Sequence, residues 1–390
     1  MNFHEFGEKA ETYVIDLLEN RRRKSRRDRV VRAVLLVMSR LFRGIVQIRL
    51  SLYRERIFRQ HIPGCLVISI GNVTVGGTGK TPVVEVFAKT LAAKGRKVAV
   101  LSRGYRSKNP PLSQRLKQRI FDPEHEPPPK VVSDGKRLLL DSELAGDEPY
   151  MLANNLPNVS VVVDKNRVKG SKYATRHLDC DTLILDDGFQ YLRLKPRLNI
   201  LLVDATNPFH NHHLLPRGFL REPVKNVRRA DYIFLTKSNG GSHLRHLKRF
   251  LRHHNPRAEI IECTHRPQYL ENVYTGERRP LESLNGKRIS AISGIAVPES
   301  FENFLKKLGA DLAYHERYVD HHRYHEQEII TFLNRSADHT VDLALTTEKD
   351  AVRFPKLVRV DIPVYFLRVE IDILSGRETF NDCINRICFL

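Results

Sequence analysis

The residues with the clearest chemical pattern form a glycine-rich turn, Gly71-Asn-Val-Thr-Val-Gly-Gly-Thr-Gly-Lys-Thr-Pro82. It follows a short apolar run and opens a helical pattern, which is the context of a phosphate-binding loop. Glycines let several backbone N–H groups converge on one phosphate, and the helix N-terminus adds positive potential. Lys80 would reach the β- and γ-phosphates of a nucleotide, and the Thr81 hydroxyl would bind Mg²⁺. The residues expected to line the nucleotide are Thr74, Val75, Gly76, Gly77, Thr78, Gly79, Lys80 and Thr81.

Two features of this loop depart from common patterns. Thr74 stands where the G-x-x-x-x-G-K-T pattern has glycine, and Val75 stands where partitioning-type ATPases carry a signature lysine. A purely structural turn is the alternative interpretation. Lys80 and Thr81 in a strand–loop–helix context favour nucleotide binding.

Carboxylates appear in two further places that phosphoryl transfer would need. Asp186 and Asp187 end the apolar run of Leu183-Ile-Leu-Asp-Asp-Gly-Phe-Gln190, where a phosphate-loop protein places its Mg²⁺-binding aspartate. Asp147 and Glu148, in Gly146-Asp-Glu-Pro149, precede a helical pattern. A kinase acting on a hydroxyl needs such a carboxylate near the acceptor oxygen. The alternatives are turn formation for the first pair and helix N-terminal capping for the second.

Two adjacent histidines, His321 and His322, are candidates for a general base or a metal ligand. The chain has 17 histidines, so their types alone favour a surface position. No further ligand spacing indicates a metal site around them.

The elements that must position these residues alternate between strand and helix, which predicts an α/β fold with a doubly wound parallel sheet. A second, smaller α/β domain follows, and residues 106–130 are expected to form a surface loop. The division predicted is 1–60 for a basic helical region, 61–229 for the phosphate-loop core and 230–390 for the second domain. Strands are expected at 65–70, 97–102, 159–164, 181–186, 198–204, 231–236, 260–263, 288–293, 341–346 and 364–369.

Charge is concentrated near the N-terminus. Residues 21–60 carry a net charge of +12 out of +20 for all 390 residues. Apolar residues from Val31 to Leu52 recur at helical spacing between the arginines, which is typical of a helix in a membrane interface. An ordinary helix packed on its own domain is the alternative. No stretch reaches the length of a membrane-spanning helix, no secretory signal is expected, and five scattered cysteines favour a reducing compartment.

In this order, the motifs resemble the tetraacyldisaccharide 4′-kinases of lipid A biosynthesis. Besides the three motifs above, the resemblance rests on Leu101-Ser-Arg-Gly-Tyr105, Leu214-Leu-Pro-Arg-Gly-Phe-Leu-Arg-Glu-Pro223, Ser293-Gly-Ile-Ala-Val-Pro298, Asp320-His-His322 and Thr347-Glu-Lys-Asp-Ala-Val352. It covers most of the chain from about 53 to 353. It implies transfer of the γ-phosphate of ATP, with Mg²⁺, to the 4′-hydroxyl of a lipid-linked glucosamine disaccharide.

The resemblance also implies roles for individual residues. Asp147 matches the carboxylate proposed as catalytic base, and His321 matches the histidine paired with it. Asp186 and Asp187 match a pair needed for Mg²⁺ binding and catalysis. Near the phosphates and metal, the family has an Arg-Glu pair with a glutamine close by, and these match Arg221, Glu222 and Gln190.

An enzyme whose acceptor carries four acyl chains must act at the surface of a bilayer. The N-terminal region, with its apolar residues and arginines, agrees with this requirement. We therefore expect an anionic membrane surface as partner, at the cytoplasmic face of the bacterial inner membrane. Nucleic acid and an obligate protein partner are not expected. The rival hypothesis is a partitioning-type switch ATPase that cycles on membranes without phosphorylating an acceptor.

Overall fold

The computed structural model describes Asp16, Leu18 and residues 25–104, 127–242, 244–295, 297–357 and 361–388. Its contacts divide the chain into two compact units. The first unit holds Met1–Lys80, Ile184–Thr264 and Ile373–Leu390, and the second holds Thr81–Leu183 and His265–Asp372. Two long strands, β8 (Glu259–Asn272) and β13 (Val364–Ser375), continue from one unit into the other.

The first unit is built on parallel strands ordered β8-β7-β6-β1. They comprise β1 (Leu66–Asn72), β6 (Leu198–Asp204), β7 (Tyr232–Thr236) and the start of β8. Their central residues are almost entirely buried, as expected for parallel strands covered on both faces. The other elements of this unit are η1 (Val224–Arg229), α8 (Leu244–His254), α12 (Arg377–Cys388) and α2 (Arg26–Arg54).

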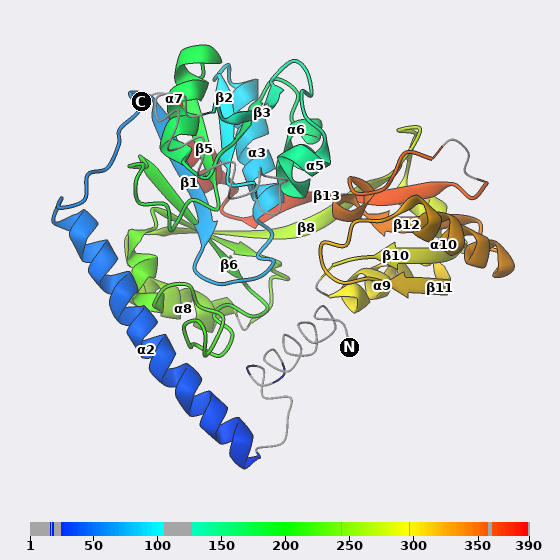
Figure 1. The fold of residues 1–390 in the computed structure, drawn as a ribbon, viewed down its shortest axis with the longest axis horizontal. Helices are drawn as coiled ribbons and strands as arrows, with labels where there is room; N and C mark the ends of the chain where they lie inside the picture. The colour runs from blue at the N-terminus through cyan, green and yellow to red at the C-terminus, as the bar shows by residue number, and fades with distance from the viewer. Residues whose placement is uncertain are drawn as a thin grey trace. The chain divides into compact units, whose positions relative to one another are not determined.

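Helix α2 is long and packs with one face only (Figure 1). Ser25 and Asp28 form a capping box at its start, which satisfies N–H groups that a helix N-terminus leaves unpaired. On the packed face, Ser39 donates a hydrogen bond to the Leu214 carbonyl and Phe42 contacts the core. The remaining apolar side chains divide between this face and solvent. The exposed ones are Val30, Val34, Val37, Met38, Leu41, Ile45 and Ile48, each 49–65% exposed.

The second unit contains two groups of strands. In one, β2 (Val98–Ser102) pairs in parallel with β4 (Ser160–Val163), which pairs antiparallel with β3 (Lys130–Asp134). In the other, the parallel order is β11-β10-β12-β13, with β11 at Asp311–Arg317, β10 at Arg288–Ser293 and β12 at Leu343–Thr347. The short β9 (Arg278–Arg279) pairs antiparallel with β8. Strand β5 (Thr182–Asp186) spans the boundary between the units.

Short helices connect these strands and bring several predicted residues to strand ends. Helix α3 (Lys80–Ala93) begins at the boundary with the first unit, and α6 (Asp147–Asn155) begins at Asp147 itself. The others are α5 (Ser142–Ala145), α7 (Arg167–His177), η2 (Leu281–Leu284), α9 (Pro298–Lys307), α10 (Glu326–Asp338) and α11 (Glu348–Ala351).

The mixed α/β fold with mainly parallel strands is confirmed, and each expected strand is present, although β8 and β13 continue nine and six residues past their predicted ends. Strands β3, β9 and β11 were not expected; β3 lies at the end of the predicted 106–130 loop, most of which falls outside the described residues. The basic residues at 21–24 fall outside them too. Within the described ranges, no helix combines the length and apolar character that crossing a bilayer requires.

Candidate active site

The glycine-rich loop follows β1 and turns sharply through backbone conformations that suit glycine. Gly76 and Gly79 have φ angles of 109° and 72°, in a region that side chains rarely adopt. Gly71 is required for another reason, because a Cβ there would lie 2.7 Å from the Phe189 nitrogen. The start of the loop therefore packs directly against the segment that follows Asp186 and Asp187.

Buried polar groups hold the loop in shape. The Asn72 side-chain amide donates to the Thr78 hydroxyl at 2.9 Å, and the Thr236 hydroxyl donates to the Thr78 carbonyl at 2.8 Å. Lys237 donates to the Gly77 carbonyl at 2.8 Å and pairs with Asp204 at 2.6 Å. Burial raises the pKa of Asp204, but hydrogen bonds from Lys237 and Thr206 outweigh it, so the pKa lies below its usual value.

The first two predicted nucleotide contacts, Thr74 and Val75, take part in a different interaction. Thr74 forms an isolated antiparallel bridge with Leu220, and the Val75 N–H donates to the Phe219 carbonyl at 2.7 Å. These bonds tie the loop to the segment that carries Arg221. The Val75 N–H is consequently engaged with protein, and the later residues 76–81 form the part of the loop that begins α3.

Asp187 lies beside both cations predicted to meet phosphate. Arg221 Nη1 contacts both Asp187 carboxylate oxygens, at 2.7 and 2.9 Å, and Gln190 Oε1 at 3.3 Å. The Lys80 Nζ is 3.8 Å from Asp187 Oδ1. A Cβ on the following Gly188 would lie 2.6 Å from Leu185 Cβ, so only glycine fits there. The structure thus gathers four of the predicted residues, Lys80, Asp187, Gln190 and Arg221, in one cluster of the first unit.

Asp186 and Glu222 are buried, and Glu222 makes a separate set of contacts. Its carboxylate accepts two hydrogen bonds from Arg229 Nη2, at 2.7 and 2.8 Å, and one from Asn226 at 2.8 Å. Arg229 also stacks over the Phe189 ring, 4.1 Å from its centroid. Glu222 therefore anchors the segment after Arg221 to the loop after Asp187. Thr81 falls in the second unit, as the second residue of α3.

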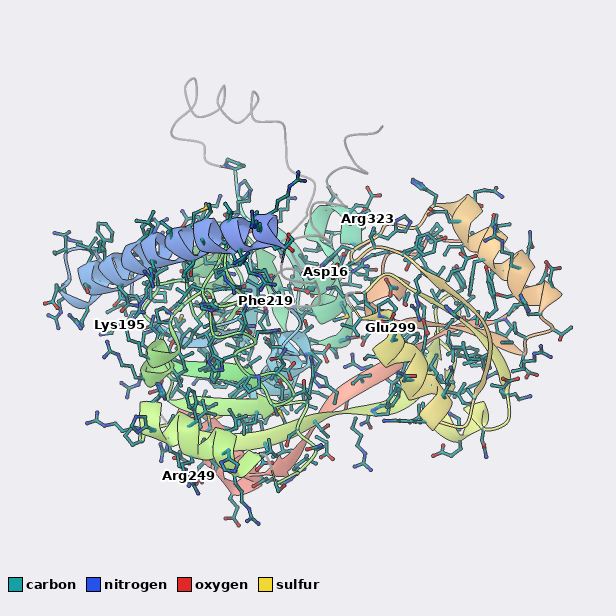
Figure 2. The ribbon with its side chains drawn as sticks, turned by 90° about the horizontal axis from the view of Figure 1, so that it is seen from below. Asp16, Lys195, Phe219, Arg249, Glu299 and Arg323 are labelled. Atoms are coloured by element: carbon teal, nitrogen blue, oxygen red, sulfur yellow. The ribbon has the colours of Figure 1, made fainter. Side chains whose placement is uncertain are left out.

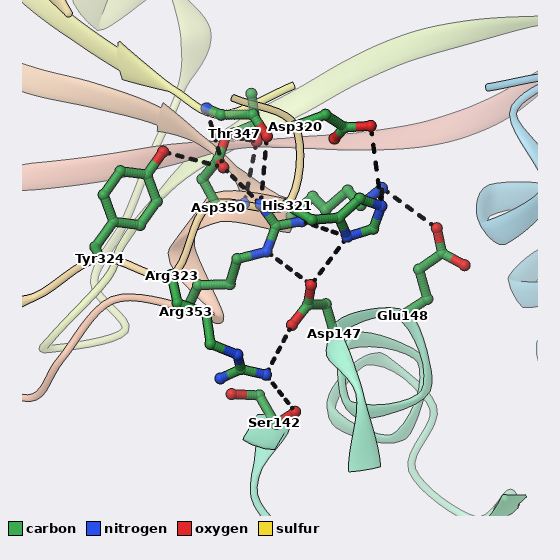
Figure 3. Close-up of polar contacts among 12 residues, drawn as sticks. Ser142, Asp147, Glu148, Asp320, His321, Arg323, Tyr324, Thr347, Asp350 and Arg353 are labelled. Atoms are coloured by element: carbon green, nitrogen blue, oxygen red, sulfur yellow. Dashed lines mark hydrogen bonds and ion pairs between the residues drawn. The ribbon is translucent and has the colours of Figure 1, made fainter. Parts of the chain in front are cut away.

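Asp147 and His321 come together in the second unit although 174 residues separate them (Figure 3). His321 Nδ1 lies 3.2 Å from Asp147 Oδ2. Asp147 stands in the first turn of α6, where a negative charge is favoured by the helix dipole. His321 has a φ of 65°, a conformation that is costly for a histidine and that turns its ring toward α6.

Arg353 is the buried centre of this cluster, with a side chain that is 0% exposed. It donates to Asp147 Oδ2 at 2.8 Å, to Asp350 Oδ1 at 3.0 Å and to the Gly294 carbonyl at 3.3 Å. Asp350 in turn accepts from the Gly294 N–H and the Tyr324 hydroxyl. One arginine thus links the carboxylates of α6 and α11 to the segment 293–298 (Figure 3).

Burial and charge oppose each other at both carboxylates. Burial raises the pKa of Asp147, but His321, Arg353 and Arg323 together outweigh it and hold the pKa below its usual value. At Asp350, burial dominates and raises the pKa despite Thr347 and Arg353. Asp147 is therefore ionised throughout the neutral range and is a weak base on its own.

Lys349 determines which His321 nitrogen can accept a proton. Its Nζ lies 3.3 Å from His321 Nε2, and an ammonium group can only donate, so Nε2 is the acceptor and Nδ1 carries the hydrogen. Arg353 Nη2, also a donor, lies 3.4 Å from Nδ1, but the Asp147 carboxylate is closer and can accept. Lys349 has a second partner in Glu148, at 3.4 Å.

The sequence did not point to several residues that shape these clusters. Thr236, Lys237, Arg323 and Arg353 each contact a predicted residue, yet each is an ordinary threonine or cation in its own segment. Lys349 falls within the 347–352 motif quoted above, and this motif was the only sequence feature that could have indicated its place in the site. Among the described residues, no three His, Cys, Asp or Glu side chains cluster as a metal site would require.

Comparison with known proteins agrees with this geometry. Residues 31–388 match the family model described as Tetraacyldisaccharide-1-P 4′-kinase. The chain belongs to this family. The resemblance stated from the motifs is confirmed, as is the prediction that the protein is an enzyme of the kinase type.

Relatives of this family match over nearly their full length. A tetraacyldisaccharide 4′-kinase of Halothermothrix orenii is 34% identical, over 97% of this chain and 98% of the relative. One of Anaeromyxobacter sp. strain Fw109-5 is 38% identical, over 90% of each chain. A crystal structure of the "apo" form of LpxK from Aquifex aeolicus in complex with ATP is 30% identical, with a TM-score of 0.70 over 92% of this chain and 99% of that one.

Proposed function

We propose that the protein transfers the γ-phosphate of ATP to the 4′-hydroxyl of tetraacyldisaccharide 1-phosphate, giving a 1,4′-bisphosphorylated lipid A precursor. Family membership supports the reaction. The observation that carries the proposal is the contact of Asp147 with His321, because a kinase acting on a hydroxyl needs such a proton acceptor, whereas a switch ATPase has no acceptor to activate.

In this proposal the acceptor hydroxyl gives its proton to His321 Nε2. Asp147 holds the ring through Nδ1 and stabilises the positive charge that the ring then gains. Arg353 keeps Asp147 ionised and fixed in place. The 4′-oxygen forms the new bond to the γ-phosphorus as the bond to ADP breaks.

Lys349 must leave Nε2 before the hydroxyl can take its place. Glu148 offers the ammonium a position 3.4 Å away, so the lysine stays held while His321 becomes available. Losing the contact with His321 costs little, because the charge-assisted contact of Lys349 with Glu148 is already present and is kept.

On the phosphate side, Lys80 and Arg221 supply the positive charge. Both now face Asp187, at 3.8 and 2.7 Å. Phosphate oxygens bring more negative charge than one carboxylate, so bound ATP would draw these two side chains toward it. Positioning and charge neutralisation of this kind account for most of the catalysis in phosphoryl transfer.

The oxygen-rich residues nearby suit Mg²⁺, which is held by one or two carboxylates together with substrate phosphates. Asp187 has a partly exposed carboxylate, and Asp186 lies beside it at the end of β5. In our proposal these two hold the ion with the Thr81 hydroxyl, and Gln190 and Glu222 support them. When bound, Mg²⁺ neutralises charge on the β- and γ-phosphates.

We also propose that α2 seats the enzyme on the cytoplasmic face of the inner membrane. Its seven exposed apolar side chains form one stripe, with arginines such as Arg40 and Arg43 exposed beside it. An apolar stripe with flanking basic residues favours a helix lying in an anionic bilayer surface. We also propose the division of the chain into three parts, 1–60, 61–229 and 230–390. We propose no nucleic-acid partner and no obligate protein partner.

The test is transfer of radiolabel from γ-labelled ATP to tetraacyldisaccharide 1-phosphate in detergent micelles. We expect labelled lipid with the native enzyme and none with Lys80→Met, which keeps most of the length of the side chain without its charge. ATP-dependent dimerisation with no labelled lipid would instead favour the switch ATPase.

A further inference from the structure

A pocket of about 630 Å³ lies in the first unit, and two of its lining residues, Asn226 and Arg229, also contact Glu222. Three elements form its walls: the second half of α2, the 3-10 helix η1 and the end of α8 with the turn that follows. The lining residues are Gln47, Leu50, Ser51, Arg54, Asn226, Arg228, Arg229, His254, Asn255, Pro256 and Arg257.

The lining is strongly basic. Four arginines and a histidine face the pocket, and no carboxylate does. Burial lowers the pKa of Arg229, Glu222 opposes this, and the neighbouring charges of Arg49 and Arg228 lower it further. The positive charges of these arginines therefore repel one another, and an anion bound in the pocket would reduce that repulsion.

Two of these arginines have no acidic partner among the described residues. Arg228 and Arg257 are exposed, whereas Arg229 pairs with Glu222 and Arg54 pairs with Glu55. The amide side chains are already satisfied, since Asn255 donates to the carbonyls of Val227 and Ala230. A basic group near the C-terminus of α8 complements the helix dipole, but that explains Arg257 and not Arg228 on η1.

The position of the pocket on α2 indicates what the anion is. Gln47 and Ser51 line it, and Ile45 and Ile48, on the same turns of the helix, are exposed apolar residues of the α2 stripe. A molecule that carries both a phosphate and acyl chains would satisfy the arginines and the stripe together. We propose that this pocket binds the phosphate-bearing headgroup of an anionic phospholipid, with its acyl chains along the α2 stripe.

The test compares binding of the full-length enzyme to phosphatidylcholine vesicles with and without phosphatidylglycerol. The pocket variant is Arg228→Gln/Arg257→Gln. The matched control is Arg245→Gln/Arg249→Gln, which removes the same charge from exposed positions on α8 that do not line the pocket. Figure 2 labels Arg249 on this helix. The pocket variant should lose about fivefold in phosphatidylglycerol-dependent partitioning per arginine, or roughly 25-fold for the two, and the control at most about twofold.

Equal losses in the two variants would overturn the proposal, because they would indicate diffuse attraction without a defined site. A variant Arg228→Lys/Arg257→Lys keeps the charge and should retain most of the binding, so a loss through misfolding can be recognised. Binding of inorganic phosphate, measured by equilibrium dialysis, distinguishes a site for a lipid headgroup from a site for free phosphate. If the pocket variant loses phosphate binding but keeps vesicle binding, the site is one for free phosphate and the headgroup assignment is wrong. All of these outcomes are binding measurements, so they do not depend on kinase activity in micelles.

Discussion

Replacing Asp147 by asparagine tests the proposed acceptor chemistry with the smallest change of shape. The carboxylate accepts from Arg353 at 2.8 Å and from His321 at 3.2 Å through the same oxygen, Oδ2. An asparagine oxygen can keep both contacts, so the position of the ring survives. What disappears is the negative charge that stabilises His321 once it has taken the proton.

The expected loss follows from that charge. A positioned acid or base contributes about 10²- to 10⁴-fold to the rate. This corresponds to about 2.7–5.4 kcal/mol of transition-state stabilisation. We therefore expect Asp147→Asn to lower kcat by at least about a hundredfold and to leave the KM for ATP within about threefold, because Asp147 is proposed to act on the acceptor and not on the nucleotide.

Stability gives an independent readout of the same substitution. The pKa of Asp147 is lower in the folded protein than its usual value, so its charge stabilises the fold above about pH 4 and this contribution is lost as the pH falls further. Asp147→Asn removes that dependence. Its denaturation midpoint should lie below that of the native protein at pH 7, and the difference should shrink toward pH 3.

Initial rates of label transfer in micelles, at varied ATP and varied lipid, measure the kinetic part. Glu326→Gln is the control, since it removes an exposed carboxylate from the first turn of α10 that has no part in the proposed mechanism. If Asp147→Asn kept more than about a tenth of kcat, or lost kcat and ATP affinity equally, Asp147 would have no specific part in activating the acceptor.

Three further changes test other parts of the structure. Lys80→Met should abolish labelled lipid while circular dichroism stays unchanged; labelled lipid at a native rate would remove Lys80 from the mechanism. Leu41→Asp/Ile45→Asp should weaken vesicle binding by tenfold or more, because each aliphatic side chain that becomes buried in the bilayer contributes about 1.5–3 kcal/mol. The same variant should leave kcat in micelles unchanged. Unchanged vesicle binding would contradict the proposed docking face. Glu348, buried beside Glu85 and Arg368, has its pKa raised to about 7, so its contribution to stability decreases as the pH rises from about 4 to 7. Glu348→Gln should therefore gain stability relative to the native protein between pH 5 and pH 8, measured as the shift in urea midpoint, and a constant difference would show that this carboxyl does not titrate there.

The sequence predicted those parts of the site that are encoded locally. The phosphate loop is recognisable because strand, glycines, Lys80 and helix follow one another without interruption. Asp147 and Asp187 are likewise recognisable, because each stands where a parallel strand or a helix begins or ends. The helical spacing of α2 was also visible, although only the structure divides its apolar residues into a packed face and an exposed stripe.

The remainder depends on contacts between distant segments. Arg353 lies 206 residues from Asp147, and one arginine among 65 basic residues has no local feature that marks it as buried. Lys237 supports the phosphate loop from 160 residues away for the same reason. The sequence did not predict strand β11, because this strand is half exposed and carries charged residues. Its residue pattern is therefore not the continuous apolar run of a buried parallel strand.

The most direct test of the proposed activity is to identify the lipid formed when the purified enzyme is incubated with ATP, Mg²⁺ and tetraacyldisaccharide 1-phosphate. Phosphorus NMR and mass spectrometry of the extracted lipid should show one added phosphate monoester, on the 4′-oxygen, with the native enzyme and none with Lys80→Met. Hydrolysis of ATP to inorganic phosphate with the lipid unchanged, or a phosphate at another hydroxyl, would contradict the proposed 4′-kinase activity.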